Sequence, residues 1–199
     1  MTIQERASEV DLRIEAAKAK LKILLLGPGW PETELQERRA LATELGRRSY
    51  NVLIMEDIQD WLTQITIIDK FHDILRRYDP QLIIGLFTKK GSPLGITFEI
   101  GYLCGFYGRG EVSRRIRFLL ESGINQRKVL SSYLRKGLFE SVAAPTFYPS
   151  EAADFIDSFA RNRILELSLD SEKGANRDGP KVDLDLIGSH RFVDDRTKT

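Results

Sequence analysis

Cysteine and histidine are scarce in this chain of 199 residues, which contains only Cys104, His72 and His190. A single cysteine cannot form an internal disulfide, so a disulfide framework and any multi-cysteine metal site are excluded. Two histidines also argue against a metal site built from imidazoles. We therefore expect neither a metal nor another cofactor.

An excess of one charge and long apolar runs are lacking as well. The chain has 30 basic and 29 acidic residues, and no block is basic enough to require a nucleic acid polymer or an anionic membrane. No apolar stretch reaches the ~18–20 residues that span a bilayer, and residues 1–20 are too charged for a signal peptide. We therefore expect a soluble, cytoplasmic protein whose partners include neither nucleic acid polymers nor membranes.

Short apolar runs alternate along the chain with segments of helical periodicity. With 42% hydrophobic residues, the composition suits one globular domain with a sizeable core. The alternation indicates an α/β fold with a mostly parallel sheet of about five strands. Strands are predicted within 22–29, 50–57, 81–87, 115–120 and 145–148. Helices are predicted at 4–20, 31–48, 61–77, 95–107, 131–142 and 150–164, the last capped by Ser150.

Composition divides the chain into three parts: an N-terminal helix at 1–20, the α/β domain at 21–167, and a tail at 168–199. The tail is polar, contains Gly and Pro and lacks periodicity, which is typical of a flexible segment. Within it, "VDLDLIG" at 182–188 could dock onto the domain.

The stretch "GITFEIGYLCGF" at 95–106 contains one ionisable carboxylate, Glu99, among apolar, small and aromatic residues. The predicted helix begins in the loop after the third strand, at the edge of the sheet where ligands bind in open α/β folds. It is apolar nearly all round, so we expect it to be largely buried, with Gly101 and Gly105 packing closely against the sheet. A buried carboxylate at a helix start could be a nucleophile, or it could cap its own helix or bond a neighbouring loop, and these interpretations remain open.

Three motifs resemble a known family in the same order. They are "KILLLGPG", "PLGITFEIGYLCG" and "KVLSSYLRKG". Together they resemble the nucleoside 2-deoxyribosyltransferase superfamily over about residues 21–160, and are closest to the branch of 2'-deoxynucleoside 5'-phosphate N-hydrolases. The resemblance implies a flavodoxin-like, Rossmann-like doubly wound fold. It also implies cleavage of an N-glycosidic bond through a covalent intermediate on Glu99, and a homodimer in which Ser131 reaches the phosphate site of the neighbouring subunit.

The chain departs from the family pattern at several positions. The phosphate-using branch has Ser and Arg after the first glycine turn, where this chain has Pro28 and Trp30. That branch also has Ser, and the transferase branch Asp, where this chain has Pro93. The family's second carboxylate has no unique match: Asp69 and Asp73 are both near, and we take Asp73 as the catalytic partner of Glu99.

Six residues are predicted to bind the substrate. Five come from the segments expected around Glu99, and Ser131 comes from the resemblance. The six residues are Gly27, Gly29, Ser92, Gly95, Tyr102 and Ser131. Tyr102 could stack a base, although an aromatic beside a sheet is often part of the core. Glu56 and Asp57, after the second strand, could meet a ribose hydroxyl or could cap a helix.

The function expected from these residues is N-glycosidic bond cleavage of a nucleoside or nucleotide, as a hydrolase or transferase with Glu99 as nucleophile. Two alternatives remain open. One is an NAD-cleaving enzyme of the TIR-like type, and the other is a nucleotide-sensing module without turnover.

Overall fold

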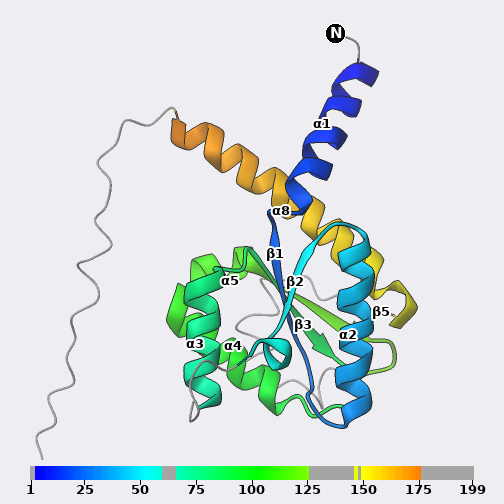
Figure 1. Ribbon diagram of the computed structural model, residues 1–199, viewed down its shortest axis with the longest axis vertical. Coiled ribbons are helices and arrows are strands. Elements are labelled where there is room, and N and C mark those ends of the chain that lie inside the picture. The colour runs from blue at the N-terminus through cyan, green and yellow to red at the C-terminus, as the bar shows by residue number, and fades with distance from the viewer. Residues whose placement is uncertain (1–2, 60–65, 126–145, 148, 176–199) are drawn as a thin grey trace, which may run out of the picture.

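A computed structural model describes residues 3–59, 66–125, 146–147 and 149–175, and within this part the chain forms a doubly wound α/β fold (Figure 1). Five parallel strands form one sheet in the order β2-β1-β3-β4-β5. The strands are β1 (Lys22–Leu26), β2 (Asn51–Ile54), β3 (Leu82–Phe87), β4 (Ile116–Glu121) and the two-residue β5 (Thr146–Phe147). The predicted fold class is therefore confirmed.

Helices cover both faces of the sheet (Figure 1). The α-helices are α1 (Ile3–Lys18), α2 (Glu32–Arg47), α3 (Ile67–Tyr78), α4 (Leu94–Tyr107), α5 (Arg109–Arg115) and α8 (Ala152–Ala175). Two short 3-10 turns, η1 (Met55–Asp57) and η3 (Pro149–Glu151), follow β2 and precede α8. Helices α1, α2 and α8 pack on one face, and α3, α4 and α5 pack on the other.

The side chains of the central strands are apolar on both faces of the sheet, because each face packs against its own hydrophobic core. Every residue of β3 is buried, and its side chains alternate between the two cores. Ile84 packs with the α1–α2–α8 side, and Ile83 packs with the α3–α4–α5 side. Gly85 lies where Phe118 of β4 approaches the backbone, since a Cβ at this position would be 2.9 Å from the ring.

The last helix differs from the prediction at both ends. Residues 168–175, predicted as the start of the tail, are helical. Ser168 donates its hydroxyl hydrogen to the carbonyl of Ile164, and Asp170 forms a 4.0 Å ion pair with Arg114, so this turn continues the helix rather than ending it. At the other end Ser150 lies inside η3 and the α-helix begins two residues later. The segment at 182–188 lies outside the described residues.

Helix α4 is less buried than predicted. Ile96, Ile100 and Leu103 face the core, whereas Leu94 is 76% and Phe98 is 55% exposed. Gly101 and Gly105, which we expected against the sheet, are exposed. Apart from the adjacent residues and the backbone of α4 itself, no atom of the described residues lies within 4 Å of a Cβ built at either glycine. The sheet covers only one side of a helix that is apolar on every side, so the glycines lie on the uncovered side.

Helix α5 was not predicted from the sequence. Gly108, with φ 75°, separates it from α4, and its Glu111 accepts a hydrogen bond from Arg115 one turn later. Of the helices within the described ranges, none combines the length and apolar character needed to cross a membrane.

Candidate active site

Loops from three strands meet at the carboxyl edge of the sheet. The strand order places β1 between β2 and β3, so chain connections leave β1 and β3 toward opposite faces, and a crevice for ligands forms at such a point. Pro28, in the loop after β1, touches Gly91, in the loop after β3, so closely that a Cβ at Gly91 would collide with the proline ring. A Cβ at Gly29 would lie 3.3 Å from Glu56 Oε1, which ties the first loop to η1.

Helix α4 brings Glu99 to this edge from the α3–α4–α5 face. The helix begins after Pro93, whose carbonyl accepts hydrogen bonds from the backbone N–H and the hydroxyl of Thr97. Glu99 follows in the second turn. Its Oε2 is buried and accepts no hydrogen bond from the described residues. Glu99 is therefore not a cap of its own helix within this part of the chain.

Burial raises the pKa of Glu99 to about 7, because a charged carboxylate loses its hydration there. The negative charge of Glu56 raises this pKa further, and the positive charge of Arg38 lowers it. Glu99 thus has a carboxyl that is partly ionised near neutral pH. Such a group is suited to proton transfer or nucleophilic attack at neutral pH.

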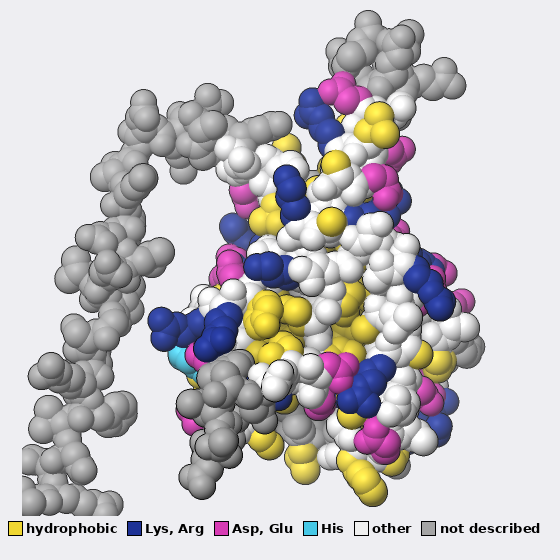
Figure 2. Space-filling view, viewed as in Figure 1, with side chains coloured by type: hydrophobic (Ala, Val, Ile, Leu, Met, Phe, Trp, Pro, Cys, Tyr) yellow, Lys and Arg dark blue, Asp and Glu magenta, His cyan; other side chains and the backbone are white. Residues whose placement is uncertain are grey.

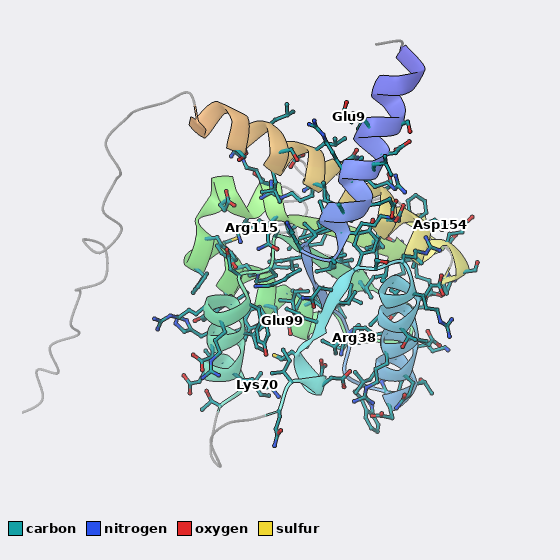
Figure 3. The ribbon with its side chains drawn as sticks, turned by 45° about the horizontal axis from the view of Figure 1, so that its top comes forward. Glu9, Arg38, Lys70, Glu99, Arg115 and Asp154 are labelled. Carbon is teal, nitrogen blue, oxygen red and sulfur yellow. The ribbon has the colours of Figure 1, made fainter. Side chains whose placement is uncertain are left out.

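Arg38 reaches the same edge from α2 on the other face of the sheet, and Figure 3 labels both Arg38 and Glu99 near the centre of the molecule. Only 4% of Arg38 is exposed. Its guanidinium donates to the carbonyl of Gly27 at 2.7 Å and to the carboxylate of Glu56. A planar guanidinium with several donors can hold two loops at once, which an ammonium group does less well.

The site therefore contains one guanidinium and two carboxyl groups, and the two carboxyl groups differ in their electrostatic surroundings. Glu56 is held in an ion pair with Arg38. Glu99 lacks a direct partner among the described residues and has a pKa near neutrality. Pairs of acids with unlike environments are the arrangement that assigns separate roles in glycosidic chemistry.

The glycine turn after β1 is part of this arrangement, as expected for Gly27 and Gly29. A Cβ built at Gly27 would lie 3.3 Å from Arg38, and one built at Gly29 would lie 3.3 Å from Glu56, so this turn lies close to the two residues whose charges shift the pKa of Glu99. Ser92 is exposed, and its hydroxyl accepts a hydrogen bond from the backbone N–H of Leu94 at 3.4 Å. Gly95 is also exposed, in the first turn of α4.

Asp73 and Tyr102 have other partners. Asp73 forms a 3.4 Å ion pair with Arg77 along α3, and it is not among the charges that shift the pKa of Glu99. Tyr102 shares a hydrogen bond with His72 Nδ1, and burial raises the pKa of its hydroxyl. Asp69, the other acid near the family's second carboxylate, accepts a hydrogen bond from Thr66 at the start of α3. The carboxylate whose charge raises the pKa of Glu99 is Glu56. The catalytic role given to Asp73 stays a prediction.

Ser131 and the whole of "KVLSSYLRKG" lie outside the described residues, so the role predicted for that serine stays a prediction. Arg38 was missed because nothing distinguishes it from the other cations of a charged helix. Glu56 was considered only as a ribose contact or helix cap, and its position directly after β2 was the signal for its place in the site.

Within the described ranges, no group of three or more His, Cys, Asp or Glu side chains is arranged to hold a metal ion. No model of a known protein family matches the chain, and no curated protein matches it significantly.

Proposed function

We propose that Glu99 is the nucleophile of an enzyme that cleaves the N-glycosidic bond of a nucleoside or nucleotide. The observation that carries this proposal is the carboxyl of the half-buried Glu99 at the carboxyl edge of the sheet. Its Oε2 is buried without a hydrogen-bond partner among the described residues, and its pKa is near neutrality. The resemblance of "PLGITFEIGYLCG" to the nucleoside 2-deoxyribosyltransferase motif supports the same role for this glutamate.

In the proposed first step, an ionised oxygen of Glu99 attacks the anomeric carbon of the sugar. The carbon–nitrogen bond breaks, its electron pair goes to the base, and the base takes up a proton from solvent. In the second step, water attacks the anomeric carbon, releases Glu99 as a carboxylate and loses a proton. A second base in place of water gives transfer instead of hydrolysis.

Arg38 and Glu56 act as positioning residues in this proposal. Arg38 lowers the pKa of Glu99 and Glu56 raises it, so the pair sets the fraction of ionised nucleophile. Arg38 is also bonded to Gly27 and Glu56, so it is not a free cation for a substrate phosphate. This favours a nucleoside over a 5'-phosphorylated substrate at the described part of the site. The acid–base role predicted for Asp73 has no contact in support of it here.

The homodimer predicted from the resemblance is part of the proposal. The uncovered side of α4, with Leu94 and Phe98 exposed, supports it because large exposed apolar side chains at one helix face suit a protein contact. Hydrophobic side chains also gather along the lower rim in Figure 2, at the edge where the strands end. Light scattering should give twice the chain mass for the wild type and one chain mass for Phe98→Glu. A wild-type monomer at micromolar concentration contradicts the dimer.

A chromatographic screen for free base tests the chemistry. Wild type, Glu99→Gln and the control Glu32→Gln, an exposed acid of α2, are incubated with deoxynucleosides, deoxynucleotides, ribonucleotides and NAD. We expect base release by the wild type and Glu32→Gln, and none by folded Glu99→Gln. Full activity of Glu99→Gln contradicts the proposed nucleophile.

The same screen separates the alternatives that share this site. Nicotinamide release from NAD alone supports the NAD-cleaving enzyme. A nucleotide recovered intact from a tight complex, without base release from any substrate, supports the sensing module.

A further inference from the structure

A cavity opens at the carboxyl edge of the sheet, lined by Gly27, Pro28 and Arg38 of the candidate active site but not by Glu99. Its volume is about 60 Å³, and it shares Glu34, Leu41 and Glu121 with a neighbouring outer depression of about 390 Å³. Its apolar wall includes Leu41, Leu86 and Ala152, which belong to or pack against the core on the α1–α2–α8 face. Glu99 lies on the helix that packs against the opposite face. We call this cavity the α2 pocket.

Three carboxylates line the α2 pocket: Glu34, Glu37 and Glu121. Two of them already have lysine partners. Glu37 lies 3.8 Å from Lys90 Nζ, and Glu121 lies 3.8 Å from Lys89 Nζ and accepts a hydrogen bond from the Lys89 backbone N–H. Both lysines are more than half exposed, so these ion pairs lie at the mouth of the pocket.

Glu34 is different from the other two carboxylates. Only 4% of this residue is exposed, and it lines both the α2 pocket and the neighbouring outer depression. Within the described part of the chain, its carboxylate has neither a hydrogen bond nor an ion pair. Its carboxylate oxygens are not among the fully buried unpaired atoms, so they keep contact with solvent in the pocket, where a cation would pair with them.

Arg38 does not supply the missing partner. Its two terminal nitrogens are bonded to Gly27 and Glu56. Its Nε is buried without an acceptor among the described residues. The pocket is therefore lined by one carboxylate, Glu34, that the described residues leave unpaired, above an apolar wall.

We propose that the α2 pocket binds a small organic cation, an amidinium or ammonium group carried on a flat apolar body. The cation pairs with Glu34, and the apolar body contacts Leu41 and Leu86. An anion is disfavoured here because Glu37 and Glu121 are paired with lysines and Arg38 is paired with Glu56, which leaves the negative charge of Glu34 uncompensated. This site is separate from the proposed nucleophile and does not depend on glycosidic activity.

Three probes of nearly equal size and different charge test the proposal by calorimetric titration of the full chain. They are benzamidine, which is cationic, benzamide, which is neutral, and benzoate, which is anionic. We expect saturable one-to-one binding of benzamidine, at least tenfold weaker binding of benzamide, and no binding of benzoate. Because this series uses the unaltered protein, its result does not depend on whether a variant folds.

Variants then locate the site. Glu34→Gln should weaken benzamidine binding at least tenfold, whereas Glu32→Gln, on the same helix but exposed, should leave it unchanged. Glu99→Gln should also leave it unchanged, because Glu99 does not line this pocket. The proposal is overturned if benzamidine does not bind, if benzamide binds equally well, or if folded Glu34→Gln binds like the wild type. Loss of binding in Glu99→Gln overturns the separation of the two sites.

Discussion

Arg38 donates a hydrogen bond to the carboxylate of Glu56 from a side chain that is almost fully buried. The contact joins α2 to the turn after β2, and a second bond from Arg38 to the Gly27 carbonyl adds the loop after β1. One guanidinium thus fixes two loops of the candidate active site. It also places its own charge and that of Glu56 where both act on Glu99.

Replacing Arg38 by methionine should destabilise the fold, because methionine keeps much of the volume but leaves two acceptors without a donor. Glu56 is partly exposed and can recover some hydration, so we expect a loss of about 2 kcal/mol in the free energy of unfolding. Urea denaturation measures this loss.

The neighbouring cation provides the control. Arg39 binds Asp57 in an exposed ion pair, so Arg39→Met should leave the urea midpoint nearly unchanged. Equal destabilisation by the two variants would mean that burial does not increase the contribution of the Arg38 contacts to the free energy of unfolding.

Glu99→Gln should stabilise the protein at alkaline pH. The carboxyl has a pKa of about 7 in the folded chain against an ordinary value of 4.5. Between these pH values the folded state binds more protons than the unfolded state, so stability falls as pH rises through this window. Above pH 7 the wild type bears a penalty of up to about 3 kcal/mol that the glutamine variant lacks.

Urea denaturation at pH 5 and pH 8 checks this expectation. The stability difference between Glu99→Gln and wild type should be small at pH 5 and should favour the variant at pH 8. Glu32→Gln, an exposed acid, should show no such change between the two pH values. A difference that is equal at both pH values would show that Glu99 titrates normally.

Glu56→Gln should lower the pKa of Glu99. The substitution removes the negative charge that raises this pKa and releases Arg38 from its ion pair, and both changes favour the ionised form of Glu99. A carbon-13 NMR titration of the glutamate carboxyl groups, assigned with Glu99→Gln, measures the shift directly. With a substrate from the screen, the rise of kcat/KM with pH should move to lower pH by the same amount.

Asp57→Asn is the matched control for this titration. Asp57 is adjacent in sequence but pairs with Arg39, and its charge is not among those that shift Glu99. It should leave the Glu99 titration where it is in the wild type. A shift to higher pH in Glu56→Gln would contradict the electrostatic role given to the Arg38–Glu56 pair.

The strands and the edge position of Glu99 could be predicted from sequence because each rests on a local signal. Continuous apolar runs such as "LIIGLF" mark strands that are buried on both faces. In a parallel sheet, the residues that follow such strands must meet at one edge. That reasoning placed Gly27, Gly29 and Glu56 correctly, since it requires no knowledge of side-chain contacts.

The partner of Glu56 could not be predicted, because it depends on how α2 packs across the sheet. Arg38 and Arg39 are adjacent and identical in type, yet one is buried and the other pairs at the surface. The exposed side of α4 could not be predicted from the sequence either. An apolar helix is expected to be buried, and its composition does not say which side the sheet leaves open.

Two glycine-to-alanine substitutions should have opposite effects on stability, which tests this account of α4. Gly101→Ala adds a methyl group to an exposed helical position with open space, and should stabilise the chain by about 0.5–1 kcal/mol. Gly85→Ala forces a Cβ to 2.9 Å from the Phe118 ring, and should cost about 1–3 kcal/mol. Thermal unfolding of both variants measures the difference. Destabilisation by Gly101→Ala in a dilute, monomeric sample would mean that this side of α4 is covered within the chain.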